Sequence, residues 1–297
     1  MLFTNKEKGN FAKDPAVIKW KEKYYLYYTI KYEPDRPGEW ERIGIGIAVS
    51  DDLEHWEQKG ELPLLYPYEE RGIGAPGAMI HNGQIHLFYQ TYGNGAKDAI
   101  CHATSMDGIN FERNPENPVY HPTAEWSCGR AIDADVCLFN GKLFLYVATR
   151  DAEMKCQIVC GAWAEPDSDF GKDAWHEIKP LMLEPTLSWE QECIEAPATL
   201  VYDNKVYLFY GGAYNCKPQQ IGCAVSEDGM QFTRIFEDPF LTNGKEGEWN
   251  SCESGHPYVF EDDGTYYLFY QGSADMGKTF YLSKREFIFE NGIPKLK

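Results

Sequence analysis

Three carboxylate side chains, Asp14, Asp133 and Glu195, head separate copies of a repeated sequence pattern. Each lies one or two residues before a recurring position that is Pro15 in the first copy and Pro197 in the fourth. Carboxylates gathered at one site repel one another, so at least one should have a raised pKa. Hydrolysis of a glycosidic bond needs one ionised carboxylate, as base or nucleophile, and one protonated carboxyl group, as acid. The pattern therefore points to acid–base chemistry on a glycoside.

The repeated unit is a short apolar segment, a turn and an aromatic strand. The recurring position, called the slot below, is Pro15, Pro76, Ala134, Pro197 and Pro257 in the five copies. The aromatic strand begins nine residues after each slot, and the strands cover residues 24–28, 85–89, 143–147, 206–210 and 266–270. One slot follows another after about 60 residues, which predicts a repeat architecture.

The second half of the unit also recurs. A third strand runs into a Ser-x-Asp turn and a last strand that opens on an aromatic residue, as at 43–56, 100–111 and 221–232. Four strands per unit predict an all-β, five-bladed β-propeller in which every blade is a four-stranded antiparallel sheet. The expected single domain spans 1–297, with blades at approximately 14–60, 75–115, 132–180, 195–237 and 255–292.

The predicted topology places two sets of side chains at one mouth of the central channel. Residues that head the inner strands lie there, among them His256 in the fifth blade. The second strand is antiparallel to the first, so its last residues return to the same mouth. Those residues include Thr29, Gln90, Arg150, Tyr214 and Gln271.

The chain is acidic, with a net charge of −18 and a pI near 4.8. We expect neither nucleic acid nor an anionic membrane surface as a partner, because both need basic patches. Polyanionic substrates are disfavoured as well, unless a local arginine cluster overrides the net charge. The nine cysteines lack zinc-type spacing and indicate reduced thiols. With no apolar membrane segment and no signal-peptide core at the N-terminus, we expect a cytoplasmic protein.

The heads of four copies carry a resemblance to a known family. Asp14-Pro15, Ala75-Pro76, Ile132-Asp133 and Glu195-Ala196-Pro197 resemble the motifs of glycoside hydrolase family 43, over roughly residues 10 to 290. The resemblance implies a five-bladed propeller of the β-xylosidase and α-L-arabinofuranosidase type. It also implies an inverting mechanism, and an exo-acting enzyme on short arabinose- or xylose-containing oligosaccharides.

Roles for individual residues follow from the same resemblance. Asp14 would be the general base that activates water, Glu195 the general acid, and Asp133 the residue that tunes the pKa of the acid. His256 is similar to a fifth-blade histidine that binds a metal or an ordered water in the channel. The chemistry itself would require no cofactor, and a structural calcium or other ion in the channel is the group that the resemblance allows.

This sequence departs from the family pattern at Ala134, Ala196 and Gly74, where the family usually has Pro, Gly and Trp. These changes remove no catalytic group but leave the sugar open. Structural alternatives also stay open. Asp14 can cap a turn, and His256 can simply fill the channel. Asp135 competes with Asp133, and Glu190 and Glu192 compete with Glu195.

Several further residues are candidates for substrate binding. Trp126, Trp189 and Trp249 lie eight residues before their slots, an offset that favours packing between blades but leaves Trp126 as a candidate to stack on a sugar ring. Arg130 and Arg150 can donate hydrogen bonds to sugar hydroxyls or pair with a catalytic carboxylate. Gln90, Tyr214 and Gln271 are weaker candidates at the same mouth.

Two other functions fit the same propeller. One is a retaining fructosidase-like enzyme or another furanosidase, such as a galactofuranosidase. The other is a sugar-binding propeller without catalysis, against which the three carboxylates speak. The sequence does not determine the oligomeric state.

Overall fold

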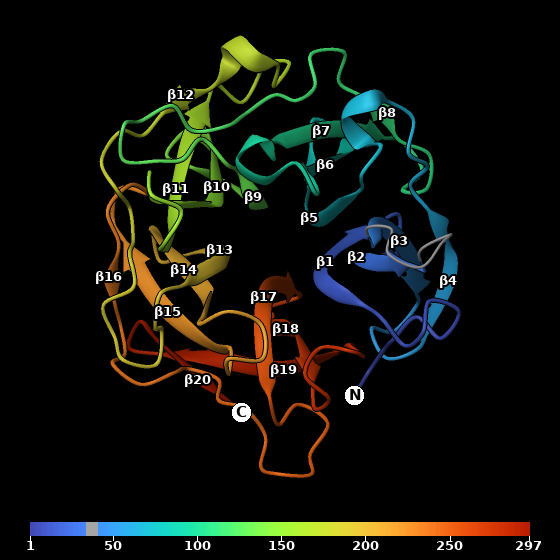
Figure 1. The fold of residues 1–297 in the computed structure, drawn as a ribbon, viewed down its shortest axis with the longest axis vertical. Coiled ribbons are helices and arrows are strands. Elements are labelled where there is room, and N and C mark those ends of the chain that lie inside the picture. The colour runs from blue at the N-terminus through green and yellow to red at the C-terminus, as the bar shows by residue number, and fades with distance from the viewer. Residues whose placement is uncertain (34–40) are drawn as a thin grey trace.

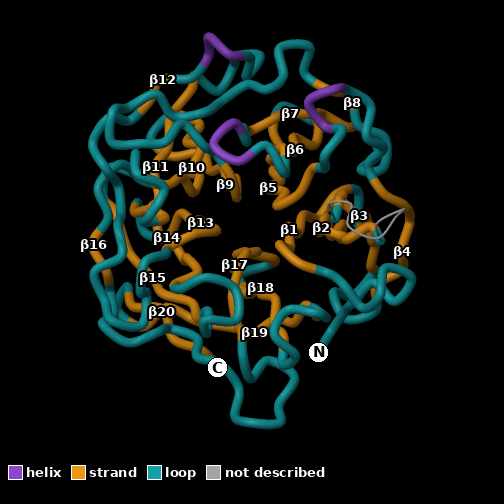
Figure 2. Tube along the Cα trace, in the orientation of Figure 1, coloured by secondary structure: helices purple, strands orange, loops and turns teal. Residues whose placement is uncertain are grey.

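A computed structural model of the chain describes residues 1–33 and 41–297. It contains five four-stranded antiparallel sheets arranged radially around a central axis (Figures 1 and 2). The predicted all-β, five-bladed propeller in a single domain is therefore confirmed. No helix of the described residues is long and apolar enough to cross a membrane.

Each blade is one continuous stretch of chain. Blade 1 contains β1 (Lys13–Trp20), β2 (Lys23–Tyr32), β3 (Arg42–Ser50) and β4 (Trp56–Glu61). Blade 2 contains β5 (Ile73–His81), β6 (Gln84–Thr91), β7 (Ile100–Ser105) and β8 (Glu112–Arg113). Blade 3 contains β9 (Ile132–Phe139), β10 (Lys142–Arg150), β11 (Gln157–Ala164) and β12 (His176–Glu177). Blade 4 contains β13 (Ile194–Tyr202), β14 (Lys205–Gly212), β15 (Gln220–Ser226) and β16 (Thr233–Arg234). Blade 5 contains β17 (Glu253–Asp262), β18 (Thr265–Ser273), β19 (Tyr281–Glu290) and β20 (Ile293–Leu296).

The aromatic strands predicted from the sequence are the second strands, β2, β6, β10, β14 and β18. Each lies between two neighbours of its own sheet and has other blades on both faces. Side chains on both faces of these strands are therefore buried. The residue thirteen places after the slot shows this in every copy, since all five are buried: Tyr28, Tyr89, Val147, Tyr210 and Tyr270. Burying a side chain of this size contributes on the order of 2 kcal/mol.

The inner strands β1, β5, β9, β13 and β17 pack against one another around the axis. All five carry a β-bulge at the slot, where the register against the second strand shifts. The residue just before the slot has a positive φ in every blade: 51° at Asp14, 43° at Ala75, 55° at Asp133, 51° at Ala196 and 43° at His256. A left-handed backbone is costly for such residues and re-aims the side chain, which is why bulges often flank active sites.

Two buried histidines stack across β6 and β7, away from the central channel. His86 Nδ1 lies 3.0 Å from His102 Nε2, and Asn114 Nδ2 donates to His102 Nδ1 at 3.2 Å. His102 Nδ1 is therefore the acceptor, and His102 Nε2 carries the proton that faces His86. Burial lowers the pKa of His86 to about 4 and that of His102 to about 3.

This pair makes the fold sensitive to acid. The unfolded chain binds protons at both histidines below a pKa of about 6.5, while the folded chain does so only near pH 4 and below. The free energy of unfolding is therefore undiminished at neutral pH. It falls as the pH drops from about 6.5 toward 4, by roughly 2 kcal/mol per histidine at pH 4.5. We expect His102→Phe to reduce the fall in melting temperature between pH 7.5 and 4.5. His121→Gln, at an exposed histidine, is the matched control, and equal falls in both variants would contradict the assignment.

Candidate active site

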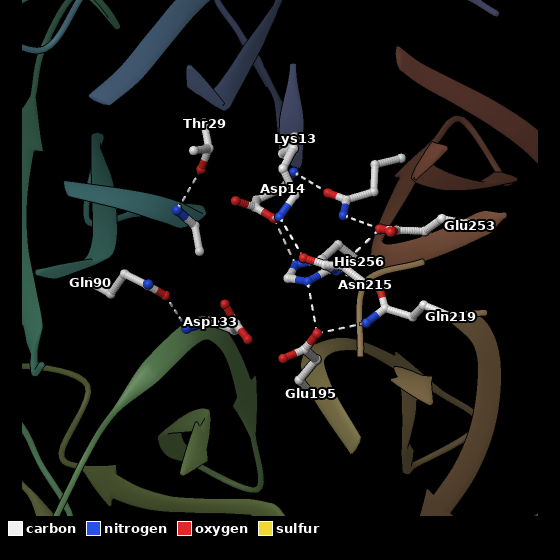
Figure 3. A network of polar contacts seen from close by, with 12 residues as sticks. Lys13, Asp14, Thr29, Gln90, Asp133, Glu195, Asn215, Gln219, Glu253 and His256 are labelled. Carbon is white, nitrogen blue, oxygen red and sulfur yellow. Dashed lines mark hydrogen bonds and ion pairs between the residues drawn. The ribbon is translucent and has the colours of Figure 1, made fainter. Parts of the chain in front are cut away.

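A cavity of about 360 Å³ opens at one end of the central channel. Its wall contains the side chains that head the inner strands of blades 1, 3, 4 and 5: Asp14, Asp133, Glu195 and His256. The convergence expected from the strand order is thus what the structure shows (Figure 3). Blade 2 presents Ala75 at the equivalent position, without an ionisable group.

The imidazole of His256 lies between two of the carboxylates (Figure 3). Its Nδ1 is 2.7 Å from Asp14 Oδ1, and its Nε2 is 3.3 Å from Glu195 Oε1. Burial alone would lower the pKa of His256, but the neighbouring carboxylates, Asp14 first, outweigh it and raise that pKa well above its usual value. His256 is therefore an imidazolium whose width separates Asp14 from Glu195.

Asp14 is held in place from two sides. Its backbone N–H donates to Gln271 Oε1 at 2.8 Å, across the junction between the last blade and the first. Lys13 Nζ lies 3.9 Å from Asp14 Oδ1 and donates to Asn215 Oδ1 at 2.9 Å. Burial would raise the pKa of Asp14, but Lys13 and His256 outweigh it and hold that pKa below its ordinary value. Asp14 is therefore ionised, as a general base must be.

Glu195 is surrounded by hydrogen-bond donors. Gln219 Nε2 donates to its Oε1 at 2.6 Å, and Gln157 Nε2 donates to its Oε2. Burial would raise the pKa of Glu195, but His256 and these contacts outweigh it and lower that pKa. In the ligand-free site the ionised form of Glu195 is favoured, which is not the state that a general acid needs.

Asp133 has the opposite character. Its backbone N–H donates to Gln90 Oε1 at 2.8 Å, while its buried Oδ2 has no hydrogen-bond partner. Burial and the repulsion of Glu195 raise its pKa to about 7, against the attraction of His256. The expectation that at least one of the gathered carboxylates has a raised pKa is confirmed. The raised value falls on Asp133, and the proton available near neutral pH lies there.

The backbone clamps on these heads recur from blade to blade. A side chain near the end of one blade's second strand accepts a hydrogen bond from the head of the next: Thr29 Oγ1 from Ala75 N, Gln90 from Asp133 and Gln271 from Asp14. Each such bond satisfies an N–H that the bulge removes from the sheet ladder. The second-strand ends therefore position the heads in space.

The channel below the cavity is almost filled. A space of about 20 Å³ remains at the level of the slots, enough for one water molecule. Tyr258 closes it on one side and donates from its hydroxyl to Ala78 O at 2.8 Å. This space is too small for a sugar ring, whereas the cavity at the mouth is large enough for one.

Asp133, Glu195 and His256 each offer a possible metal-ligand atom, and these atoms lie within 4.8 Å of one another. Both nitrogens of His256 face carboxylates and its pKa is raised, so a cation would have to displace the proton of the ring before His256 could act as a ligand. An ion in the channel remains a prediction, which elemental analysis with and without a chelator tests.

The other predicted side chains divide into two groups. Gln90, Arg130, Arg150 and Tyr214 line the cavity. Gln271 is fully buried, and its amide is hydrogen-bonded to Asp14 and Glu253. It therefore positions the site from behind, and the prediction that it contacts substrate is wrong.

The prediction that Trp126 stacks on a sugar ring in the cavity is also wrong. Its Nε1 donates to Lys179 O at 2.9 Å and its ring packs on the core cluster of blades 2 and 3, outside the residues that line the cavity. Trp189, at the same offset, stacks on Tyr210. Trp249 likewise lies beside Tyr270, so the constant offset of these tryptophans reflects a packing contact with the blade that follows each of them.

Two competitors of the catalytic carboxylates have structural partners. Glu190 is buried and ion-paired to Arg234 at 2.7 Å, the arrangement that Glu69 and Arg113 repeat in blade 2. Asp135 Oδ2 accepts hydrogen bonds from the backbone N–H and the hydroxyl of Thr199.

Sequence reasoning missed four residues that shape the site: Lys13, Gln157, Asn215 and Gln219. Lys13 directly precedes Asp14, so its proximity was visible. Gln157 opens β11 and Gln219 directly precedes β15, the third strands of adjacent blades. A glutamine at the start of the third strand in both blades is the sequence signal that could have identified Gln157 and Gln219.

Comparison with known proteins decides the family. The model of glycosyl hydrolases family 43 matches residues 5–291. The chain belongs to family 43. This membership places it among enzymes that hydrolyse glycosidic bonds, and the geometry above is that of its candidate active site.

Solved structures share the fold of this family 43 chain. A thermostable family-43 glycoside hydrolase superposes with a TM-score of 0.78 at 22% identity, covering 96% of this chain and 92% of the other. The endo-1,4-beta-xylanase from Bacteroides thetaiotaomicron gives 0.75 at 21% identity, covering 96% and 94%. The α-L-arabinofuranosidase from Lactobacillus brevis gives 0.73 at 15% identity, covering 99% and 97%.

Curated relatives match parts of the chain. Sucrose-6-phosphate hydrolase from Zymomonas mobilis is 37% identical over 181 residues, which are 57% of this chain and 33% of the relative. Raffinose invertase from Escherichia coli is 26% identical over 266 residues, 74% of this chain and 54% of the relative. The family 43 chain thus spans about a third to a half of the length of these relatives.

Proposed function

We propose that the protein is an exo-acting, inverting glycosidase that removes terminal arabinofuranosyl or xylosyl residues from short oligosaccharides. The observation that carries the proposal is the set of three carboxylates around one imidazolium at the closed end of a cavity. Asp14 acts as the general base, Glu195 as the general acid and Asp133 as the residue that tunes the acid.

In this mechanism an ionised Asp14 oxygen takes a proton from a water molecule as that water attacks the anomeric carbon. Glu195 gives a proton to the departing glycosidic oxygen. Since Glu195 is ionised in the free site, it must first acquire that proton. Asp133 holds one near neutral pH and has an oxygen within 4.8 Å of Glu195, so the two carboxyl groups influence each other's titration, and a proton that passes from one to the other needs a bridging water molecule.

A screen of aryl glycosides tests the proposal. Arabinofuranoside, xyloside and galactofuranoside are compared for release of the aryl alcohol. Turnover of either of the first two at a rate abolished by Asp14→Asn supports it. No turnover of any glycoside by folded protein would favour a propeller that only binds sugar.

The stereochemistry of the product is a separate prediction. Asp14 and Glu195 approach opposite nitrogens of the same ring, and this spacing leaves room for a water molecule between base and sugar. We expect proton NMR to show the inverted anomer as the first product. A retained anomer would contradict the inverting mechanism and make Asp14 a nucleophile.

The second candidate is a retaining fructosidase-like enzyme. It is favoured by the names of the curated relatives, a sucrose-6-phosphate hydrolase and a raffinose invertase. Release of fructose from sucrose or raffinose, faster than release of pentose from the aryl glycosides, would select it. A cytoplasmic location stays a prediction that cell fractionation tests.

A further inference from the structure

The cavity has a cationic side that contrasts with the rest of the protein. The whole chain carries a net charge of −18, yet four basic side chains border this one opening: Lys13, Lys31, Arg130 and Arg150. Three of them have polar partners, since Lys31 pairs with Glu41 at 2.5 Å, Lys13 binds Asn215, and Arg130 lies 3.6 Å from Asp98. The two arginines of blade 3 are differently placed.

Arg150, the last residue of β10, is fixed without being neutralised. Its Nε donates to Gln157 Oε1 at 3.2 Å and its Nη1 to Met154 O at 3.4 Å, both uncharged acceptors. The guanidinium lies over the ring of Tyr214, 5.4 Å from its centroid. Among the described residues, no ion pair includes Arg150. The guanidinium is thus held in one orientation in advance, and Nη2 remains available to a ligand in the cavity.

Arg130 is mostly buried, with 16% of its side chain exposed, and its Nε has no hydrogen-bond partner. Arg130 forms an ion pair with Asp98, whose Oδ2 lies 3.6 Å from Nε, but at this distance the two groups are not hydrogen-bonded. Asp98 already accepts a hydrogen bond from Asn94 N through its other oxygen. A buried charged donor without an acceptor is unfavourable, and an anionic ligand oxygen would satisfy it.

The two arginines come from adjacent segments. Cys128 N donates to Arg150 O at 3.0 Å, which holds the strand end beside the segment that leads to Arg130. Both side chains then face the same cavity, on the side of blade 3 that also carries Asp133. Two guanidinium groups on one wall match the geometry of a carboxylate or phosphate better than that of neutral hydroxyls.

We propose that Arg130 and Arg150 form a subsite for an anionic group on the substrate, a uronate carboxylate or a phosphate ester. This inference rests on the proposed function and specifies its substrate class. The three carboxylates repel an anion, so the charged group is directed to the arginine side of the cavity. The bond to be cleaved is thereby oriented toward Asp14 and Glu195.

Matched substrates that differ by one charge test this subsite. An aryl xyloside is compared with the aryl glucuronide, which adds a carboxylate, and an aryl glucoside is compared with its 6-phosphate. Losing a charged hydrogen bond costs about 1.5–3 kcal/mol, so kcat/KM should favour the anionic member by roughly 10- to 100-fold. The preferred pair identifies the source as carboxylate or phosphate. In Arg150→Gln and Arg130→Gln the ratio should fall to about one.

Arg285→Gln is the matched control, because Arg285 is an exposed arginine on β19 whose side chain donates to Lys297 O. The preference should survive in this variant and weaken with added salt. Equal kcat/KM within both pairs, or a preference kept in Arg150→Gln and Arg130→Gln, would overturn the inference.

Binding of inorganic phosphate, measured by titration calorimetry, tests the subsite without any substrate turnover. One-to-one binding that is lost in Arg150→Gln and kept in Arg285→Gln supports the subsite even if no glycoside is cleaved, an outcome that would contradict only the proposed function. If inorganic phosphate does not bind, and the neutral and anionic substrates of each pair are turned over equally, the subsite is rejected.

Discussion

Asp14→Asn is expected to lower kcat by about 10³- to 10⁴-fold. General-base catalysis is worth up to this much, and the amide cannot accept the proton of the attacking water. The substitution keeps the size of the side chain, so its backbone bond to Gln271 stays available and the fold should persist. Steady-state kinetics on the best aryl glycoside, with a thermal melt of each protein, measures both effects.

Asp51→Asn is the control for this experiment, because the Asp51 side chain is 80% exposed and pairs only with a surface lysine. It should keep wild-type kcat. If Asp14→Asn retained more than about a tenth of the activity, Asp14 would be a structural turn residue and the base would have to be found elsewhere.

Glu195→Gln is expected to cause a loss that depends on the leaving group. Alkyl glycosides and natural linkages need a proton on the departing oxygen, so their kcat should fall by about 10²- to 10⁴-fold. A dinitrophenyl glycoside leaves without that proton and should be nearly spared. Glu227→Gln, at a side chain that is 83% exposed in the same blade, serves as the control.

The same comparison in Asp133→Asn separates the two candidate proton donors. The pKa of Asp133 is raised to about 7 while that of Glu195 is lowered, so Asp133 is the rival proton donor that this comparison tests. Dependence on the leaving group in Asp133→Asn alone would make Asp133 the acid. Its tuning role predicts a dependence on the leaving group in Asp133→Asn that is weaker than in Glu195→Gln, because the proton of Glu195 is then no longer tuned.

Most of the fold could be predicted because the signal was repeated. Five aromatic strands at a constant nine-residue offset, with turn residues at equivalent places, determine strand order and therefore which strand ends meet. The left-handed backbone at Asp14 and Asp133 could not be predicted. Locally these residues avoid it, and only the packing of five inner strands and the clamps from Gln90 and Gln271 impose it.

The sequence could predict which carboxylates gather at the candidate site but not which of them are protonated. Asp14 and Asp133 stand out because they occupy the position that is Ala75 in blade 2, and Glu195 stands out because it lies one residue before that position in blade 4. Their charge states depend on distances to His256, to Lys13 and to buried amides, which no single sequence supplies. For the same reason, the sequence could not show that the amide of Gln271 faces Asp14 and Glu253.

The hydrogen bond from Asp14 to Gln271 joins residues that are 257 positions apart in the chain. Asp14 lies in the first blade and Gln271 in the fifth, so during synthesis Asp14 leaves the ribosome before the residue that fixes its backbone. The first catalytic group to be made is therefore the last to be fixed in place. If Asp14 is the base, as proposed, hydrolysis depends on completion of the whole ring, because a chain that lacks the fifth blade lacks the hydrogen bond from Asp14 to Gln271.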